Sequence, residues 1–303
     1  MRVLITGASG FIGFKLAKLL LLQKHVVTGT FSSNKPPIEG CHVTELDVTD
    51  KKMVSRVFSM AKPEVVFHLS AITNVDLCEK DKGLALRVNV DGTRNIAGEC
   101  EKNAAKMVFA STSAVFGGKK TFFEDSDYCP ANFYGETKML AEKIIKKDCR
   151  DFVIARTDHP YGWRTQWQKD NSVTRNLKKF ADGLEVKDVV DWFNTPTYSE
   201  NLVKALAEAT GKKLGGVFHF SGPDFLNRYE LAVKTAKAFG FDPKMVKKMQ
   251  SSEMPILAKR QNCRLDNKKT LSCINTEFWG VDKSLKHMAG SASGADLELV
   301  GLN

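Results

Sequence analysis

The feature that most constrains this chain is a glycine-rich turn close to its start. The apolar run Val3–Ile5 predicts a strand, the segment Thr6–Gly13 (TGASGFIG) follows it, and an amphipathic helical pattern comes next. In such a turn one glycine makes the tight bend, one lets the backbone approach a pyrophosphate, and one lets the helix pack close to the strand. Backbone N–H groups at a helix N-terminus also bind phosphate. The turn therefore predicts a dinucleotide site contacted by Gly7, Ser9, Gly10, Phe11, Ile12 and Gly13.

Short apolar runs alternate with helical patterns through the first half of the chain. We expect strands at Arg2–Thr6, His25–Thr30, Val65–Leu69, Lys106–Ser111 and Phe152–Arg156, and helices at about 11–23, 50–61, 83–103 and 134–147. This alternation favours a parallel sheet with helices on both faces. The sequence therefore predicts an α/β fold of the doubly wound Rossmann type.

The pattern changes after Arg156. We expect a lid-like loop at Tyr161–Asp170, helices at 172–182, 199–209, 228–240 and 242–249, and apolar runs at Leu184–Val190 and Gly216–Phe220. This predicts a cofactor-binding domain over 1–157 and a smaller, partly interleaved substrate lobe over 158–290, with segments that return to the main sheet. The last residues, 291–303, are expected to form a flexible tail.

Composition excludes several classes of protein. The net charge is +10, but the lysine pairs are spread along the chain, so we expect no nucleic-acid partner. The seven cysteines contain no C-x-x-C spacing, which argues against a disulfide framework or a zinc site, and no metal site is expected. The most apolar run, Leu16–Leu22, is too short to span a bilayer and contains Lys18. The chain is expected to be cytoplasmic, with no membrane partner.

The end of the second strand indicates which dinucleotide is bound. An acidic residue there would bind the adenosine ribose and signal NAD, but this chain has none. Hydroxyls and a lysine suit a 2′-phosphate instead, which predicts NADP(H); the alternative is that they are ordinary turn residues. The expected contacts are Phe31, Ser32, Ser33 and Lys35, with Asp47 and Val48 near the adenine.

A Y-x-x-x-K pair supplies the candidate chemistry. Tyr134 and Lys138 lie on one face of an expected helix, and an adjacent ammonium would lower the pKa of the Tyr134 hydroxyl toward working pH. A tyrosine of this kind can act as the general acid for a carbonyl that is being reduced. The segment Ser111–Gly117 closes the preceding strand and presents hydroxyls at the edge of the sheet where ligands bind.

These motifs together resemble the extended short-chain dehydrogenases/reductases. Within that group the chain is most similar to the dTDP-4-dehydrorhamnose reductases, over about 1–288. Besides the glycine turn, the resemblance rests on Leu69–Glu79, on Val190–Tyr198, and on the later positions Asn89, Phe220–Gly222, Arg228, Tyr229, Arg260, Leu265 and Asp266.

The resemblance implies NADPH-dependent reduction of a nucleotide-linked keto-deoxy sugar, with a nucleotide-sugar substrate and a homodimer as the candidate assembly. It implies Thr112, Tyr134 and Lys138 as the catalytic residues. Further cofactor contacts would come from Leu69, Ser70, Ala71, Thr73 and Asn89. Substrate contacts would come from Thr73, Val75, Thr112, Ser113, His159, Trp163 and Arg260, with Arg260 on the phosphates; Trp163 has the alternative of packing in the lobe.

Three departures from the family pattern keep other functions open. Ser113 and Ala114 replace an Asp and a Tyr, Trp192–Asn194 replaces a Gln-x-Gly, and Gln261 replaces a proline. All of these would lie near the sugar. The same sequence group includes the regulatory β subunit of methionine adenosyltransferase, so an NADP-binding regulatory subunit is one alternative, and a nucleotide-sugar epimerase or dehydratase is another. His68, which ends an expected strand, is predicted to be a core residue rather than a base.

Overall fold

The computed structural model describes residues 1–118, 120–211, 214–260 and 262–302. Within them, a seven-stranded sheet has the order β12-β7-β5-β4-β1-β2-β3, and every neighbouring pair is parallel. The strands are β1 (Arg2–Thr6), β2 (Val26–Phe31), β3 (His42–Glu45), β4 (Val65–His68), β5 (Lys106–Thr112), β7 (Phe152–Thr157) and β12 (Gly216–His219). The expected doubly wound Rossmann fold is confirmed, and β12 returns to the sheet from the second half of the chain.

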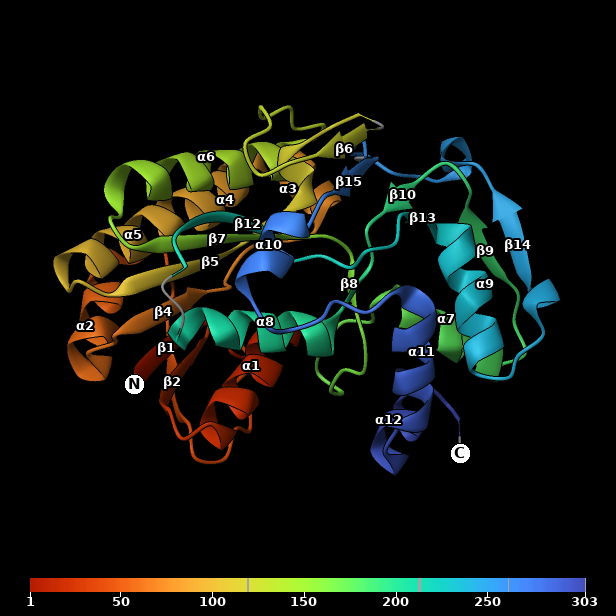
Figure 1. The fold of residues 1–303 in the computed structure, drawn as a ribbon, viewed down its shortest axis with the longest axis horizontal. Helices are drawn as coiled ribbons and strands as arrows, with labels where there is room; N and C mark the ends of the chain where they lie inside the picture. Colours follow the sequence, from red (N-terminus) through yellow and green to blue (C-terminus); the bar gives the residue numbers. More distant parts are fainter. Residues whose placement is uncertain (119, 212–213, 261, 303) are drawn as a thin grey trace.

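Helices cover both faces of the central sheet (Figure 1), and alternate residues of a strand pack against opposite helical layers. Val3 and Ile5 pack toward α1 (Phe11–Leu22) and α8 (Ser199–Gly211), whereas Leu4 packs toward the other layer. That second layer consists of α2 (Lys51–Ala61), α5 (Gly92–Lys102) and α6 (Phe133–Asp148). Because the period of side chains along a strand is two, a strand that is apolar throughout is buried on both faces.

The expected helix at 83–103 is interrupted. The structure has α4 (Lys82–Leu86), a π-helical turn at Arg87–Asp91, and then α5. The π-helical turn contains Asn89, whose side chain is buried and bonded to the backbone of Ile72. A short helix that the sequence did not indicate, α3 (Val75–Lys80), precedes it.

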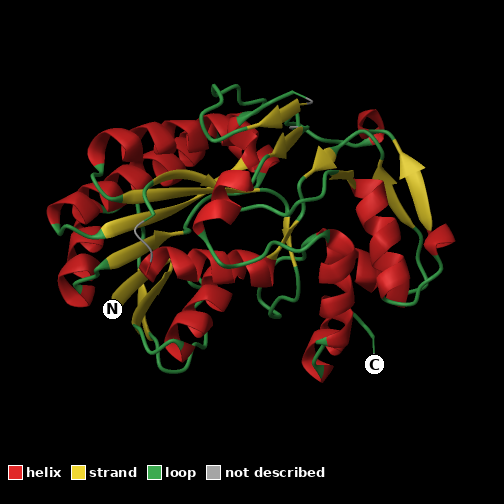
Figure 2. Cartoon of the chain, in the orientation of Figure 1, coloured by secondary structure: helices red, strands yellow, loops and turns green. Residues whose placement is uncertain are grey.

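A smaller lobe lies beside the carboxyl ends of the strands (Figure 2). Its helices α7 (Ser172–Ala181), α9 (Arg228–Ala238) and α11 (Val281–Gly290) enclose an apolar cluster that includes Val173, Leu231 and Leu285. Short strand pairs tie the lobe together and to the main body: β8 (Pro160–Tyr161) with β11 (Thr197–Tyr198), β9 (Val186–Val189) with β14 (Val246–Met249), β10 (Phe193–Asn194) with β13 (Leu226–Asn227), and β6 (Lys120–Phe122) with β15 (Cys263–Leu265). Helix α10 (Lys268–Cys273) packs beside β12. The boundaries at 157 and 290 stay predictions.

One expectation for the second half was wrong. The segment 242–249 is a 3₁₀ turn (Pro243–Met245) followed by β14, because the parallel partner β9 supplies hydrogen bonds that a local apolar spacing does not reveal. The tail contains a short helix, α12 (Gly294–Leu299), which starts at a Ser293 cap that pairs with Asp296. Val300 is 1% exposed, and the flexibility of the tail stays a prediction.

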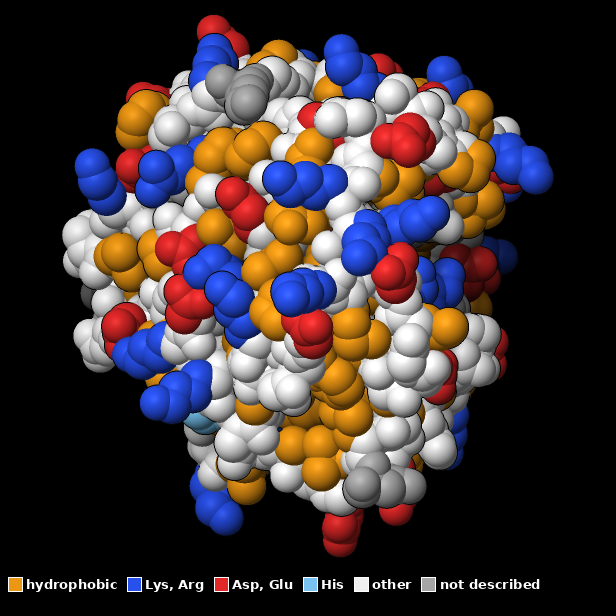
Figure 3. Space-filling model, turned by 90° about the vertical axis from the view of Figure 1, so that its right-hand side faces the viewer, with side chains coloured by type: hydrophobic (Ala, Val, Ile, Leu, Met, Phe, Trp, Pro, Cys, Tyr) orange, Lys and Arg blue, Asp and Glu red, His pale blue; other side chains and the backbone are white. Residues whose placement is uncertain are grey.

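Basic side chains on the face of the smaller lobe are dispersed among acidic and apolar ones (Figure 3). The positive net charge is therefore not gathered into one block on this face. Among the described residues, no helix has the length and apolar character needed to cross a membrane.

Candidate active site

The glycine turn forms an open cradle between β1 and α1. Gly7 has φ +73°, and a Cβ at Gly13 would lie 2.3 Å from the Gly7 carbonyl oxygen, so neither position accepts a side chain without strain. Gly10 is the N-cap residue of α1 and has no side chain that could bind the free N–H groups of the first turn. That turn carries no acidic residue either. Backbone N–H groups at this helix end are therefore available to an anion, and the cradle fits a dinucleotide pyrophosphate.

A cavity of about 550 Å³, here called the main cavity, runs from this cradle to the smaller lobe. It brings together most of the residues that the sequence indicated for the site. The predicted residues that line it are Gly7, Gly10, Phe11, Ile12, Gly13, Leu69, Ala71, Thr73, Val75, Thr112, Tyr134, Lys138, His159 and Arg260. Trp192 and Asn194, which were expected near the sugar, and Arg228, a family position with no predicted role, belong to the same lining, whereas the sequence did not indicate Asp158.

The residues predicted to contact the adenosine end of the cofactor lie at the ends of β2 and β3 and in the loops that follow. Ser32, Ser33 and Lys35 are exposed directly beyond the carboxyl end of β2, at the edge of the sheet that carries the glycine turn. Phe31 ends β2 and is partly buried. Asp47 accepts hydrogen bonds from the backbone and hydroxyl of Thr49. None of these residues lines the main cavity, so their cofactor role stays a prediction.

Val48 is buried, and a Cβ at Gly92 would lie 2.6 Å from it. This close contact shows that Val48 packs beneath the loop against α5. Its predicted contact with the adenine also remains untested.

Three other predicted cofactor residues act on the loops around the cavity. Ser9 is partly buried, and its carbonyl oxygen accepts hydrogen bonds from Trp167 and Gln168. The backbone N–H of Ser70 donates to the Thr6 hydroxyl, next to the glycine turn. Asn89 binds both backbone groups of Ile72 and donates to Thr137 on α6, so it holds the loop that carries Ala71 and Thr73.

Tyr134 and Thr112 meet at the centre of the main cavity. Thr112 is the last residue of β5, and its hydroxyl accepts a hydrogen bond from the Ala114 N–H and is also hydrogen-bonded to the Tyr134 hydroxyl. The Asn132 side chain accepts a hydrogen bond from the Gly135 N–H and so caps the N-terminus of α6, which places Tyr134 in the first turn of the helix. Burial raises the pKa of Tyr134 to about 12, which the Thr112 hydrogen bond only partly opposes. The phenol therefore carries its proton at neutral pH.

Lys138 lies one helical turn from Tyr134, as expected, but its ammonium has other contacts. Its Nζ donates to the Ala110 carbonyl oxygen at 2.7 Å and lies 3.8 Å from the centroid of the Phe109 ring. Burial lowers the pKa of Lys138 to about 7, against the attraction of Glu142. The expectation that Lys138 lowers the pKa of Tyr134 is wrong for this arrangement, because burial of the phenol dominates and the ammonium is held at Ala110.

A buried ion pair fixes α6 behind these residues. Arg156 and Glu142 approach to 2.7 Å, with side chains that are 1% and 0% exposed. Glu142 also accepts hydrogen bonds from Ser111 and Tyr128. Arg156 above all, with these two hydroxyls, holds the pKa of Glu142 below the usual range despite its burial. The pair joins β7 to α6, so it keeps Lys138 in register with the sheet.

Asp158 is a buried carboxylate at the substrate side of the cavity. It accepts hydrogen bonds from the Ser113 hydroxyl at 2.7 Å and the Thr195 N–H at 2.6 Å, with Asn194 at 3.5 Å. Burial raises its pKa to about 6. Ser113 is outside the lining of the main cavity and its hydroxyl holds this carboxylate, so its contact with substrate stays a prediction. Asp158 comes directly after β7, whereas the family's Asp position is Ser113 in this chain.

Two guanidinium groups flank Trp192 at the far end. Arg260 lies 5.5 Å from the Trp192 ring and pairs with Asp76 at 2.5 Å, and Arg228 lies 6.0 Å from the same ring and 3.3 Å from Asp188. Gln261, one of the departures noted above, lies outside the described residues. This end of the cavity is cationic and aromatic, which suits a nucleoside diphosphate.

His159 and Trp163 have different outcomes. His159 lines the cavity with φ +43°, and its ring is hydrogen-bonded to Ser172; burial lowers its pKa to about 3, so the ring is neutral. Trp163 packs in the lobe with its N–H on the Met288 carbonyl, in line with the alternative that the sequence left open, and its contact with substrate stays a prediction. His68 is the core residue that was expected, hydrogen-bonded to Thr6 and Thr93.

Comparison with known proteins agrees with this geometry. Residues 1–292 match the family model described as the RmlD substrate binding domain. The chain belongs to this family. It is 31% identical to a dTDP-4-dehydrorhamnose reductase of Mycolicibacterium smegmatis, over 86% of this chain and 76% of that protein. It is also 25% identical to the methionine adenosyltransferase 2 subunit beta of Pongo abelii, over 92% of this chain and 83% of that protein.

Solved structures of the family share the whole fold. A dTDP-4-dehydrorhamnose reductase from Clostridium acetobutylicum superimposes with a TM-score of 0.83 at 28% identity, covering 96% of this chain and 99% of the other. One from Bacillus anthracis, solved in complex with NADP, has a TM-score of 0.83 at 24% identity, covering 96% and 99%. The resemblance seen in the sequence is confirmed.

Proposed function

We propose that this protein is an NADPH-dependent reductase of a 4-keto-6-deoxy sugar linked to a nucleoside diphosphate. The observation that carries the proposal is that one cavity brings three groups together. The glycine cradle comes from the turn between β1 and α1, Thr112, Tyr134 and Lys138 come from β5 and α6, and Arg228 and Arg260 come from the smaller lobe. A cofactor pyrophosphate and a substrate diphosphate would thus be held in one cavity with the proton donor.

The fit of the cradle to a dinucleotide supports NADP(H) as the cofactor, as does the absence of an acidic residue at the end of β2. The Bacillus anthracis relative was solved with NADP. When bound, NADPH supplies the reducing equivalents to the ketone carbon. The glycine cradle would hold the pyrophosphate, and the exposed Ser32, Ser33 and Lys35 would face the 2′-phosphate.

The protein's own part is proton delivery and positioning. Tyr134 is protonated at neutral pH and hydrogen-bonded to Thr112, so it donates its proton to the carbonyl oxygen while the Thr112 hydroxyl orients that oxygen. Lys138, with a pKa of about 7, lies one turn away and can return a proton to this chain of hydroxyls. Asp158, on the opposite wall, offers an acceptor for a sugar hydroxyl.

The test is turnover by the purified chain alone. We expect loss of the reduced-nicotinamide absorbance when the protein and NADPH receive a dTDP- or UDP-linked 4-keto-6-deoxy sugar. Tyr134→Phe is the matched control, because it removes the phenolic hydroxyl and keeps the ring. No turnover on either sugar nucleotide by the native chain, with NADPH binding intact, would contradict the proposal.

A second candidate is an NADP-binding regulatory subunit. Two observations favour it: the similarity to methionine adenosyltransferase 2 subunit beta, and Trp192, which lies between the two guanidinium groups where a sugar would enter. Under this function the chain would bind NADP and reduce no sugar nucleotide. Co-purification with a methionine adenosyltransferase catalytic chain would distinguish it.

A further inference from the structure

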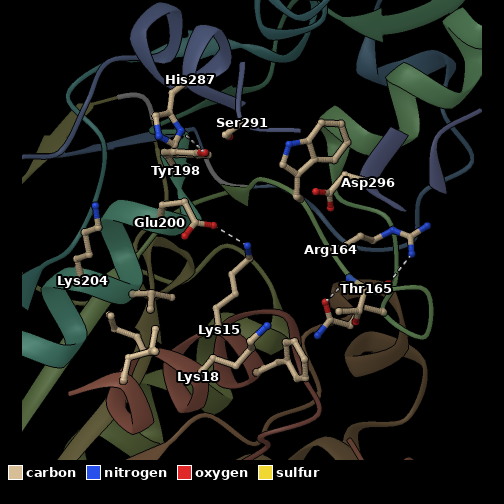
Figure 4. A pocket seen from close by; sticks show the side chains of 16 residues that line it. Lys15, Lys18, Arg164, Thr165, Tyr198, Glu200, Lys204, His287, Ser291 and Asp296 are labelled. Atoms are coloured by element: carbon tan, nitrogen blue, oxygen red, sulfur yellow. Dashed lines mark hydrogen bonds and ion pairs between the residues drawn. The ribbon is translucent and has the colours of Figure 1, made fainter. Parts of the chain in front are cut away.

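A second cavity, of about 470 Å³, lies on the other side of α1 from the glycine turn (Figure 4). Helices α1 and α8 of the main body form one wall, and α11, α12 and the loop 161–171 of the smaller lobe form the other. Its volume is within the range of sites that enclose small organic molecules. It lies at the junction between the two parts of the fold.

The floor of the second cavity is apolar and its rim is cationic. Phe14, Leu19 and Val203 provide apolar surface, and Trp163 adds an aromatic wall. Among the described residues, the lining carries four lysine or arginine side chains and two carboxylates. A site of this composition is complementary to a small molecule with an apolar body and a negative charge.

The two carboxylates are already engaged. Glu200 pairs with Lys15 at 2.6 Å, and Asp296 accepts hydrogen bonds from Ser293 at the start of α12. Lys18 and Lys204 have no carboxylate within ion-pair distance among the described residues. Their ammonium groups lie only near aromatic rings, Lys18 at 5.6 Å from the Phe14 centroid and Lys204 at 6.0 Å from that of Trp279. Two cations at the rim are thus available to an anion.

The loop that borders this cavity also braces the cofactor cradle. Gln168 lines the second cavity, and its amide donates to the carbonyl oxygens of Ser9 and Gly10 at 3.2 and 3.1 Å. Trp167 donates to Ser9 at 3.3 Å, and its ring meets the edge of Phe14. Gly10 lines the main cavity. One loop therefore contacts both cavities.

We propose that the second cavity binds a small organic anion with an apolar body, and that its occupation strengthens NADP binding through the loop 161–171. A molecule seated against Thr165 and Gln168 holds the loop where it braces the glycine turn. Because coupling between two sites is reciprocal, NADP must strengthen anion binding by the same factor. This effect does not require turnover, so it stands or fails independently of the proposed function.

The probe is 1-anilinonaphthalene-8-sulfonate, an aromatic anion whose fluorescence rises on binding. Saturating NADP occupies the cofactor part of the main cavity, and the component of probe binding that Lys18→Glu removes reports on the second cavity. We expect this component to amount to one probe per chain. Lys18→Glu and Lys204→Glu should each raise the probe Kd roughly tenfold, since each replaces an attraction by a repulsion at an exposed position. Lys237→Glu makes the same change of charge at an exposed position of α9 and should change the probe Kd by no more than about twofold.

The coupling is measured on the component of probe binding that Lys18→Glu removes. Its Kd should be at least about fivefold lower with NADP than without. In Gln168→Ala the ratio should fall to about one, because the amide that contacts Ser9 and Gly10 is lost. The ratio compares two Kd values of the same variant, so a general change in probe affinity does not alter it. No binding in the presence of NADP, or equal effects of Lys18→Glu and Lys237→Glu, would overturn the site. A ratio of one in the native chain would overturn the coupling. If light scattering shows that the chain self-associates and the probe does not bind, the face belongs to a second copy of the chain and the anion site is overturned.

Discussion

The buried carboxylate of Asp158 gives a prediction whose size can be worked out from the structure. Its side chain is almost completely buried, and burial, the largest influence, raises its pKa to about 6 from 3.8. The folded chain therefore retains a proton that the unfolded chain releases. The contribution of Asp158 to the free energy of unfolding is fully present below the unfolded pKa and is lost as the pH rises through the folded pKa.

The pKa difference between the two states is about two units, and each unit corresponds to about 1.4 kcal/mol. Most of this change falls between about pH 4.5 and about pH 7.5, where linkage gives a loss of about 2 kcal/mol. Asp158→Asn does not titrate. The stability of the native chain minus that of Asp158→Asn should therefore fall by about 2 kcal/mol across this range.

The assay is urea unfolding of both chains at several pH values, followed by tryptophan fluorescence. Taking the difference between chains removes the contributions of the buried histidines, which are common to both. Ser113→Ala is the control, because it removes one hydrogen bond and keeps the carboxylate. It should be less stable than the native chain and keep the native pH trend. A difference that stays flat or rises with pH would show that Asp158 is ionised in the folded chain at low pH, and would refute the reasoning.

Other variants test the cofactor site, the acid and the tail. Lys35→Ala should weaken NADPH binding and leave NADH binding nearly unchanged in a calorimetric titration, because only NADPH carries the 2′-phosphate. Tyr134→Phe should lower the rate of reduction by roughly 10²–10⁴-fold and keep the cofactor Kd, as steady-state rates and binding titrations will show. Gly13→Ala should abolish NADP binding in the same titration, because its Cβ would lie 2.3 Å from the Gly7 carbonyl oxygen. Val300→Ala should lower the midpoint of thermal unfolding through a loss of about 1 kcal/mol, because Val300 is buried. A flexible tail would show no change.

The glycine turn and the strands of the main sheet could be predicted because their signals are local. The positive φ of Gly7 and the close approach of Gly13 to the Gly7 carbonyl oxygen arise within one turn. An apolar run such as Val65–Phe67 indicates burial on both faces of the sheet. The spacing of Tyr134 and Lys138 likewise follows from one helical turn. The sequence alone therefore determined the fold class, the place of the cofactor cradle and the candidate acid.

The tertiary structure decided what depends on partners distant in the chain. The strand at 246–249 exists because β9 lies beside it, and Trp163 is a packing residue because Met288 accepts its N–H. Arg228 and Arg260 flank Trp192 only because folding brings three distant segments of the chain together.

The chemistry of the site shows the same division. Position in the sequence places Lys138 beside Tyr134, yet burial sets the pKa of each, and the Ala110 carbonyl holds the ammonium. Asp158 carries no motif of its own; it becomes a buried acid because Ser113 and Thr195 converge on it from other segments. Local spacing determines which groups are near one another along the chain, whereas desolvation and hydrogen bonding depend on everything that surrounds a group, and only the folded chain defines those surroundings.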